Sequence, residues 1–385
     1  MKKKLLFCMV ILLMAFPFSA CGGGSSAPPA DTGDASEDAG GGEAAAESDS
    51  SDWIDLDLTF ATYLAENNPC QGIITSLQEN LDEVMPGKVT ITTYGNATLF
   101  AAADIYDGVI NGTADIGYVQ VDFTADRLPL AQLPQLSAFA YNSAGVATQV
   151  WRDFLAEVQP AEFDDVVVIQ AQCGGPQVFQ MGSAPIKAFG DFKGKQIATA
   201  GARGKTVAAY GATPVTMDVT EYYESLRSGL VDGVYTMFGA GAFSNLDDVV
   251  DYALVSPLQN LVCVFAMNKE VFNSMPPSQQ EAFMAACEAN YDDYTINYQE
   301  EGLLIDRVKE YARALKEIDF IEGDLLEECK KANEPILTEY LAVLEDKGFD
   351  NPQQYVDLLN GLIDKYNAEY PWDNYKAIFD ELKAQ

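Results

Sequence analysis

The sequence predicts an α/β protein with two lobes, each built on a parallel sheet, and a helical C-terminal region. In the block Asp191–Phe238, short apolar strand candidates alternate with short helix candidates, and glycines mark the turns between them. Residues 56–119 show the same order, and apolar residues at helical spacing dominate from Ser278 onward. At ~100–200 residues per domain, a chain of 385 residues is expected to form two such lobes.

The N-terminus has the pattern of a bacterial export signal. Lysines follow Met1, the stretch 5–18 is apolar, and small residues come directly before Cys21. The apolar stretch is too short for a comfortable membrane span. The box Phe18–Cys21 resembles the cleavage site of a bacterial lipoprotein. We therefore expect residues 1–20 to be removed and Cys21 to carry a lipid that anchors the protein to the cell membrane. An ordinary cleaved signal with a chance cysteine is the alternative.

Residues 21–52 are expected to form a disordered linker, because Gly22–Asp52 is rich in small and acidic residues and contains no basic residue. The whole chain has 58 acidic and 23 basic residues, which gives a formal net charge of −35. This acidity argues against nucleic acid or an anionic membrane surface as a partner. It does not exclude an anionic ligand, because a binding site can be locally basic.

No sequence feature indicates catalysis or a bound metal. The chain has no histidine, no CxxC spacing, no phosphate-binding loop and no nucleophile motif, so we expect neither an enzyme nor a cofactor. The cysteines that follow Cys21 are expected to be small buried apolar residues, and a disulfide between two of them stays open. These cysteines are Cys70, Cys173, Cys263, Cys287 and Cys329.

The first lobe is expected to comprise residues 53–174 and 262–301. Apolar and polar residues alternate over Ile54–Phe60, which is the period of a strand. Further strands are expected at Val89–Thr92 and Ile116–Val119, with an amphipathic helix before each. This order of strand and helix indicates a parallel sheet.

The second lobe is expected to comprise residues 175–261 and 302–385, including the C-terminal helices. Its strands are expected at Gln196–Thr199, Ala212–Val215 and Val231–Tyr235, separated by short helices that end near glycines. In an open parallel sheet, ligands bind at the carboxyl ends of the strands. We therefore expect a site at the turns that follow the first and the third of these strands.

Four short motifs within the block 191–238 resemble the signature of the solute-binding proteins of tripartite ATP-independent periplasmic (TRAP) transporters, and a weaker similarity extends over residues 56–300. The resemblance implies a periplasmic-binding-protein-like fold with a ligand cleft between two lobes, and a location outside the cytoplasm. It also implies that the chain crosses between the lobes near residues 173–176 and 261–266, and that membrane permease subunits receive a small organic solute from the protein. The motifs are Lys193-Gly194-Lys195, Gly211–Val215, Tyr222–Gly229 and Val231-Asp232-Gly233.

The resemblance also implies where a ligand carboxylate would bind, and here the chain departs from the family. Two arginines of the second lobe usually hold the carboxylate, and their places fall on Gln177 and Ala198. A guanidinium is the strongest carboxylate clamp that a side chain offers. Either the ligand is not a simple monocarboxylate or another cation has taken over, and Arg203 is the obvious replacement. The alternative is that Arg203 is exposed or pairs with an acidic residue.

Further candidates on the second lobe surround these positions. The family's ligand-contacting asparagine falls on Thr236, which follows Tyr235 and lies near Phe238. Phe179 shares a strand face with Gln177, because side chains two residues apart on a strand point the same way. The three aromatic residues are expected either to line the cleft as stacking surfaces or to be ordinary core aromatics.

Candidates on the first lobe come from the ends of two predicted strands. Tyr118 and Gln120 end the third strand, and Glu66 and Asn67 lie in the loop after the first. Because these positions are also at carboxyl ends, we expect them near the ligand. The alternative for Glu66 and Asn67 is that they only cap the helix that follows.

Together these features predict a lipid-anchored, extracytoplasmic receptor of a TRAP-type secondary transporter. The sequence favours an aromatic or weakly charged organic solute, because both expected arginines are missing. One alternative is a receptor for organic acids that uses Arg203. The other is a ligand sensor that docks to a signalling receptor instead of a permease.

Overall fold

A computed structural model describes most of the chain. The described residues are 51–64, 68, 71–291 and 306–383. Cys21, Glu66, Asn67 and Cys70 lie outside them, and so do the expected signal at 1–20 and most of the expected linker.

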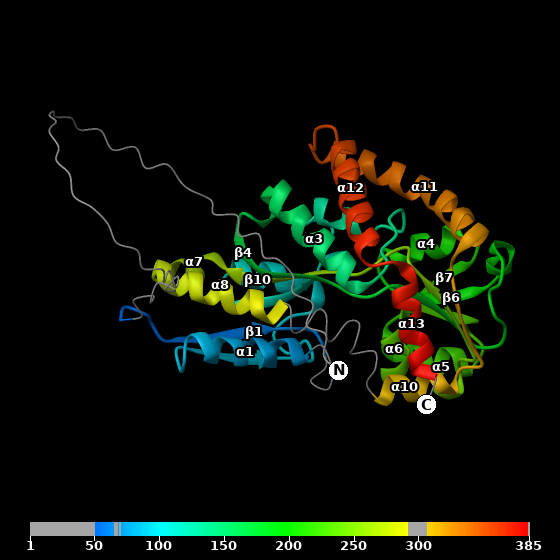
Figure 1. The fold of residues 1–385 in the computed structure, drawn as a ribbon, viewed down its shortest axis with the longest axis horizontal. Helices are drawn as coiled ribbons and strands as arrows, with labels where there is room; N and C mark the ends of the chain where they lie inside the picture. The colour runs from blue at the N-terminus through cyan, green and yellow to red at the C-terminus, as the bar shows by residue number, and fades with distance from the viewer. Residues whose placement is uncertain (1–50, 65–67, 69–70, 292–305, 384–385) are drawn as a thin grey trace, which may run out of the picture. The chain divides into compact units, whose positions relative to one another are not determined.

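The first sheet is built from β1 (Leu56–Ala61), β2 (Val89–Tyr94), β3 (Ile116–Gln120), β4 (Val166–Cys173) and β10 (Val262–Asn268). The order of its five strands is β2-β1-β3-β10-β4. β1, β10 and β4 of this sheet are labelled in Figure 1. The first three run parallel, as predicted, whereas β10 runs antiparallel to both β3 and β4. The carboxyl end of β3 therefore lies beside the start of β10, where Gln120 pairs with Cys263.

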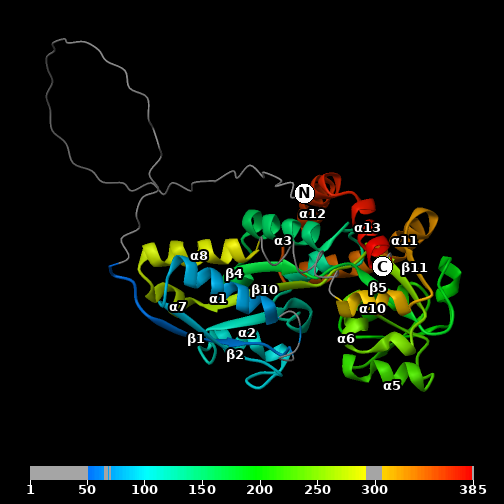
Figure 2. The ribbon, with the colours of Figure 1, turned by 60° about the horizontal axis from the view of Figure 1, so that its bottom comes forward.

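Helices cover both faces of the first sheet. They are α1 (Gly72–Val84), α7 (Lys269–Ser274) and α8 (Pro277–Tyr291) on one face, and α2 (Ile105–Ile110) and α3 (Ala144–Val158) on the other. Ile73, Leu77 and Leu81 recur every four residues in α1, which places all three on its buried side. α1 lies next to α8 (Figure 2). Ser143 caps α3, because its side chain accepts a hydrogen bond from the Val146 N–H.

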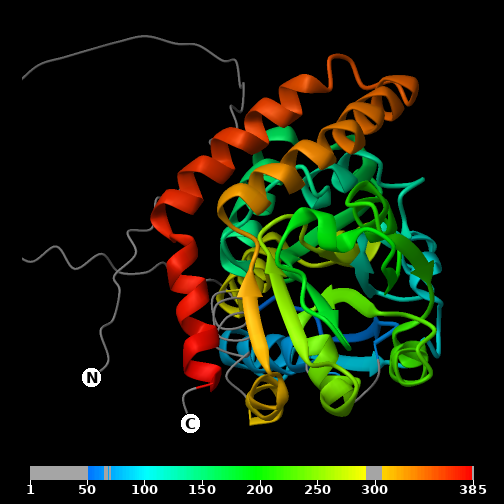
Figure 3. The same ribbon diagram turned by 90° about the vertical axis from the view of Figure 1, so that its right-hand side faces the viewer.

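The second sheet is built from β5 (Gln177–Met181), β6 (Gln196–Thr199), β7 (Thr213–Thr216), β8 (Gly233–Met237), β9 (Tyr252–Ser256) and β11 (Glu317–Phe320). Its six strands have the order β11-β9-β5-β8-β6-β7. In Figure 3 the molecule is viewed from the side on which this sheet lies. β6 runs parallel to β7 and β8, as the sequence predicts. β5 runs antiparallel to β8 and β9, so the start of β5 lies beside the carboxyl end of β8.

The remaining helices are short until the C-terminus. They are α4 (Arg203–Ala209), α5 (Tyr222–Arg227), α6 (Phe238–Phe243), α10 (Asp306–Ala314), α11 (Gly323–Asp346), α12 (Gln353–Glu369) and α13 (Trp372–Lys383). Short 3-10 helices connect several elements: η2 (Ala102–Asp104), η3 (Val121–Phe123), η4 (Leu130–Gln135), η5 (Ala161–Phe163), η6 (Phe189–Phe192), η7 (Val219–Glu221) and η8 (Leu246–Asp248). None of the helices in the described ranges combines the length and the apolar character that a membrane crossing requires.

The C-terminal helices contact both layers. The sequence places residues 302–385 with the second lobe, but α12 packs along α3 of the first layer (Figure 1). Ile336 and Leu344 of α11 and Leu359 of α12 belong to the same apolar cluster as α3. α11 also contacts α4, and α13 packs with α10 on the second sheet. α11 and α12 therefore join the two layers instead of belonging to one.

The chain passes between the sheets at residues 174–176, as the resemblance implies, and at residues 257–261; the return crossing implied at 261–266 falls mostly on β10 of the first sheet. The two crossings run together, because the Gly174 N–H donates to the Leu261 carbonyl at 2.7 Å. A Cβ atom on Gly174 would lie 2.7 Å from the Met237 sulfur and 3.1 Å from Leu261 Cβ. Only glycine allows the crossing strands to approach the end of β8 this closely.

The four cysteines within the described ranges are buried and form no disulfide, which confirms the expectation that they are small core residues. They are Cys173, Cys263, Cys287 and Cys329. No disulfide therefore contributes to the stability of this part of the chain.

Candidate ligand-binding site

Arg203 is the only charged side chain among the buried residues of the described ranges, at 8% exposure. It is the first residue of α4 and follows the carboxyl end of β6, where the sequence predicts a site. Its Nε donates to the Ala200 carbonyl at 3.1 Å, and its Nη1 donates to Gln177 Oε1 at 3.3 Å. The guanidinium forms no ion pair with any acidic residue that the structure describes. Arg203 is thus buried and forms no ion pair within the part of the chain that the structure describes, which favours the binding interpretation over the exposed or acid-paired one.

The hydroxyl of Tyr222 lies in the electrostatic field of Arg203. Tyr222 is fully buried in α5, and its hydroxyl has no hydrogen-bond partner among the described residues. Burial raises the pKa of Tyr222, and the positive charge of Arg203 opposes this rise. An unpaired buried hydroxyl is costly, because the group has lost its hydrogen bonds to water. A bound ligand could accept a hydrogen bond from it.

Asp122 of the first layer meets the turn that carries Arg203. It lies in η3, directly after β3, and its Oδ2 would be 2.7 Å from a Cβ atom built on Gly201. Gly201 has φ +61°, so the position suits glycine for its backbone as well as for the space. Burial raises the pKa of the Asp122 carboxyl, and Arg203 opposes the shift. The carboxyl ends of β3 and β6 therefore bring an acid and a base close together without a direct ion pair.

A hydrogen-bonded chain of side chains supports Asp122. Gln120 Nε2 donates to Asp122 Oδ1 at 2.6 Å, and the Tyr63 hydroxyl donates to Gln120 Oε1. The Tyr63 ring lies 5.5 Å from Phe123, whose side chain is 37% exposed. Amide, carboxylate and aromatic groups thus lie together at the end of β3.

The second crossing adds two amide side chains to this region. Gln259 accepts a hydrogen bond from the Thr206 hydroxyl of α4 at 2.9 Å. Its neighbour Asn260 is 4% exposed, and neither polar atom of its side chain has a partner among the described residues. The region around α4 therefore contains unsatisfied polar groups from several elements.

The structure places the predicted aromatic residues in the core, which is the second of the two interpretations given for them. Phe179 and Tyr235 are fully buried and stack on each other, with ring centroids 4.0 Å apart and planes inclined by 17°. Phe238 packs on Tyr311 and Phe379. These rings are held by protein neighbours and offer no free face to a ligand in this arrangement.

The remaining candidates have different environments. Gln177 contacts Arg203, whereas Ala198 is fully buried in an apolar cluster. Thr236 is buried in β8, paired across the sheet with Val178. The hydroxyl of Tyr118 lies 3.0 Å from the sulfur of Cys263, within the core of the first layer. Glu66 and Asn67 are outside the described ranges, so their predicted role stays a prediction.

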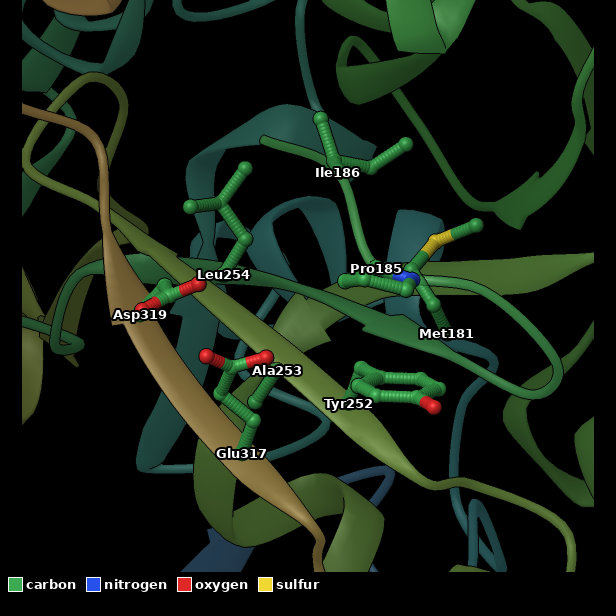
Figure 4. A pocket seen from close by; sticks show the side chains of 8 residues that line it. All are labelled: Met181, Pro185, Ile186, Tyr252, Ala253, Leu254, Glu317 and Asp319. Carbon is green, nitrogen blue, oxygen red and sulfur yellow. The ribbon is translucent and has the colours of Figure 1, made fainter. Parts of the chain in front are cut away.

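A hollow at the other end of β5 is not part of this site (Figure 4). It is lined by Met181, Pro185, Ile186, Tyr252, Ala253, Leu254, Glu317 and Asp319, and has no space for a water molecule. Lys187 forms ion pairs with both Glu317 and Asp319, so both acids there already have a basic partner. The buried polar groups near Arg203 remain the better candidate.

Sequence reasoning missed Tyr222 and Asp122. Tyr222 looks like part of an apolar helix face, but a buried tyrosine usually needs a partner for its hydroxyl, and that is a usable signal. Asp122 lies two residues beyond the end of β3, within reach of the carboxyl edge at which ligands bind in such sheets. That Asp122 faces Arg203 could not be predicted, because it depends on how the two sheets meet.

Comparison with known proteins agrees with this architecture. The chain is 26% identical over 149 residues to an uncharacterized protein, YiiZ, of Salmonella typhimurium. The match covers 38% of this chain and 46% of YiiZ, so the chain spans about half the length of that relative. A TRAP periplasmic solute-binding protein of Desulfovibrio salexigens is similar in structure, with a TM-score of 0.72, 23% identity and coverage of 83% of this chain and 98% of that chain. In that structure, an open complex, the C-terminus of a neighbouring molecule is bound in the ligand-binding site.

A second structure of similar fold is a marine metagenome TRAP solute-binding protein specific for aromatic acids, in complex with 3-hydroxybenzoate. It has a TM-score of 0.71 and 20% identity, and the alignment covers 82% of this chain and 99% of that chain. At these identities the structural likeness establishes the fold. The family of bacterial extracellular solute-binding proteins, family 7 (DctP), matches residues 60–342, and the chain therefore belongs to this family, whose members bind solutes outside the cytoplasm and are not enzymes.

Proposed function

We propose that this receptor captures a small organic acid and that Arg203 holds its carboxylate. The observation that carries the proposal is a buried guanidinium without an acidic partner among the described residues. Burying an unpaired charge is costly, and the cost is recovered when an opposite charge arrives. The chain has 58 acidic residues, yet none of those described pairs with Arg203, so the anion is best supplied by the ligand.

Gln177 and Tyr222 complete the proposed carboxylate site. The guanidinium of Arg203 has five N–H donors, of which Nε and Nη1 each make one hydrogen bond to the protein. The remaining donors and the unpaired Tyr222 hydroxyl could bind the two oxygens of a carboxylate. Each hydrogen bond to a charged group is worth about 1.5–3 kcal/mol. This set replaces the two family arginines whose places are taken by Gln177 and Ala198.

The rest of the ligand would contact the end of β3. Tyr63 and Phe123 present aromatic rings there, next to Asp122. An aromatic group on the acid therefore remains a reasonable expectation, with these two rings in place of Phe179 and Tyr235. The aromatic acid bound by the metagenome protein of similar fold is consistent with this class of ligand.

Ligand entry requires the two layers to separate, because Arg203 is only 8% exposed. The crossings at 174–176 and 257–261 are the natural hinge, since few backbone segments pass between the sheets there. In this proposal, closure around the ligand creates the form that membrane permease subunits accept. The lobes would comprise residues 53–174 with 262–301, and residues 175–261 with 302–385, of which α11 and α12 also contact the first lobe.

The experiment that tests this function is mass spectrometry of the compound that stays bound through purification, compared before and after denaturation of the protein. We expect a small molecule with at least one carboxylate. A bound compound that carries no acidic group would overturn the proposal.

We also propose that the mature protein is anchored by a lipid on Cys21, after removal of residues 1–20, and that residues 21–52 form its linker. The lipoprotein-like box before Cys21 supports this step. Cys21→Ser is expected to move the protein from the membrane fraction to the soluble fraction and to prevent labelling by a radioactive fatty acid. Equal labelling of the variant and the wild type would exclude Cys21 as the attachment site.

A further inference from the structure

Asp122, which lies close to Arg203, bears on the chemistry of the rest of the ligand. We infer that Asp122 selects organic acids that carry a hydrogen-bond donor, either a hydroxyl or an ammonium group, in addition to their carboxylate. This inference rests on the proposed function, because it requires Arg203 to hold the carboxylate.

Asp122 lies close to Arg203 but forms no ion pair with it. Its Oδ1 accepts the hydrogen bond from Gln120 at 2.6 Å, and its Oδ2 lies against Gly201, two residues before Arg203. The structure shows no ion pair between the two side chains, both of which are described. A purely structural acid beside a buried arginine would be expected to contact it directly. The arrangement instead leaves an acid and a base that one ligand could bridge.

The support of Asp122 keeps its carboxylate available as an acceptor. The Tyr63 hydroxyl donates to Gln120 Oε1, which turns Gln120 Nε2 toward Asp122 Oδ1. The Gly201 turn borders Oδ2 without a side chain, because any Cβ atom there would come within 2.7 Å of it. Gln120 and the backbone N–H groups of Asp122 and Phe123 therefore hold the Asp122 carboxylate in place, and its Oδ2 borders the turn that precedes Arg203.

Electrostatics gives this acid a role in selection. A plain monocarboxylate at Arg203 would bring a second negative group close to Asp122, and two acids that share a site repel each other. A donor on the ligand removes this penalty by forming a hydrogen bond with Asp122. The same residue thus disfavours plain acids and favours acids with a donor, which is how binding sites commonly discriminate between similar ligands.

Matched sets of acids test the inference. Phenylacetate, mandelate and phenylglycine differ only in a hydrogen, a hydroxyl or an ammonium group beside the carboxylate, and so do propionate, lactate and alanine. Binding would be measured by isothermal titration calorimetry for the wild type and for Asp122→Ala. A matched control is Asp126→Ala, which removes the same charge from a fully exposed side chain nearby. Circular dichroism would establish that both variants are folded.

For the wild type we expect the hydroxy or the amino acid of at least one set to bind about 10-fold or more tightly than the plain acid. Asp122→Ala is expected to reduce that ratio to about 1, whereas Asp126→Ala keeps it. The inference is overturned if the affinity ratio between the substituted and the plain acid persists in Asp122→Ala, or if the wild type binds the plain acids with the same affinity as the hydroxy and amino acids. Either result leaves the proposed function standing. Binding that survives Arg203→Met unchanged, or no binding by any of the six acids, counts against the proposed function instead.

Discussion

Gly201→Ala is the sharpest probe of the junction between the two sheets, because Gly201 is constrained in two separate ways. Its φ of +61° is in the left-handed region, where alanine costs roughly 1–2 kcal/mol. In addition, the new Cβ atom would lie 2.7 Å from Asp122 Oδ2, so the carboxylate would have to move. Moving it strains the hydrogen bond from Gln120, and such a bond to a charged group is worth up to about 1.5–3 kcal/mol. Because Asp122 is partly exposed, we expect the lower end of that range.

A matched control separates these two effects. Gly211 also has a positive φ, +86°, but nothing lies within 4 Å of a Cβ atom built on it. Gly211→Ala should therefore show the backbone cost alone, about 1–2 kcal/mol, and Gly201→Ala about 2–4 kcal/mol. The assay is urea unfolding followed by circular dichroism, with both substitutions repeated in an Asp122→Ala background. There the difference between the two glycines should disappear, as a double-mutant cycle requires. Equal losses for Gly201→Ala and Gly211→Ala in the wild-type background would refute the contact between the two layers.

The same structure leads to predictions for three other side chains. Arg307 binds both carboxylate oxygens of Asp247, at an interface where the two side chains are 27% and 35% exposed, so Arg307→Met is expected to lower the free energy of unfolding by about 1 kcal/mol at pH 7. Arg307 lowers the pKa of Asp247 below its ordinary 3.8, so the contribution of this ion pair to stability is present above pH 3.8 and is lost as the pH falls below it. Urea unfolding should therefore show a difference in stability between the wild type and Arg307→Met at pH 7 that shrinks markedly at pH 3. A difference that is the same at both pH values would contradict the assignment. Tyr222→Phe removes a buried unpaired hydroxyl, so the unliganded protein should melt at the same or a higher temperature while its affinity for an organic acid falls about 10-fold; unchanged affinity would remove Tyr222 from the proposed site. Asn333 donates to the Ser137 carbonyl at 2.7 Å and to a tyrosine hydroxyl at 3.0 Å, so Asn333→Ala should cost about 2–3 kcal/mol in urea unfolding, and a loss well below 1 kcal/mol would show that α11 does not depend on these bonds.

The elements of the fold were predictable where local patterns decide them. The apolar runs and glycine turns of the block 191–238 predict β6, β7 and β8 to within about two residues. The expectation that a site lies at the carboxyl end of a parallel strand directed attention to the turn after β6, and the structure places Arg203 there in a buried position. Both inferences use information that is local in the sequence.

The parts that failed depend on contacts between distant segments. Strand alternation places Phe179 and Gln177 on one face, but it does not say that α4 and η6 cover the Phe179 end of that face with Tyr210 and Phe192. The same limitation explains why α12 was assigned to the second lobe although it packs on α3. A helix pattern shows which side is apolar and leaves open which layer covers it.

We propose that Arg203, which is buried and forms no ion pair with a described acidic residue, binds the carboxylate of the ligand. The most direct test is isothermal titration calorimetry of the acid identified by mass spectrometry, with Arg203→Met compared with Lys205→Met, which removes a cation of the same helix from an exposed position. With two charged hydrogen bonds lost, Arg203→Met should weaken binding at least about 100-fold, whereas Lys205→Met should change it less than about 3-fold. If Arg203→Met binds the acid with wild-type affinity, Arg203 does not hold its carboxylate.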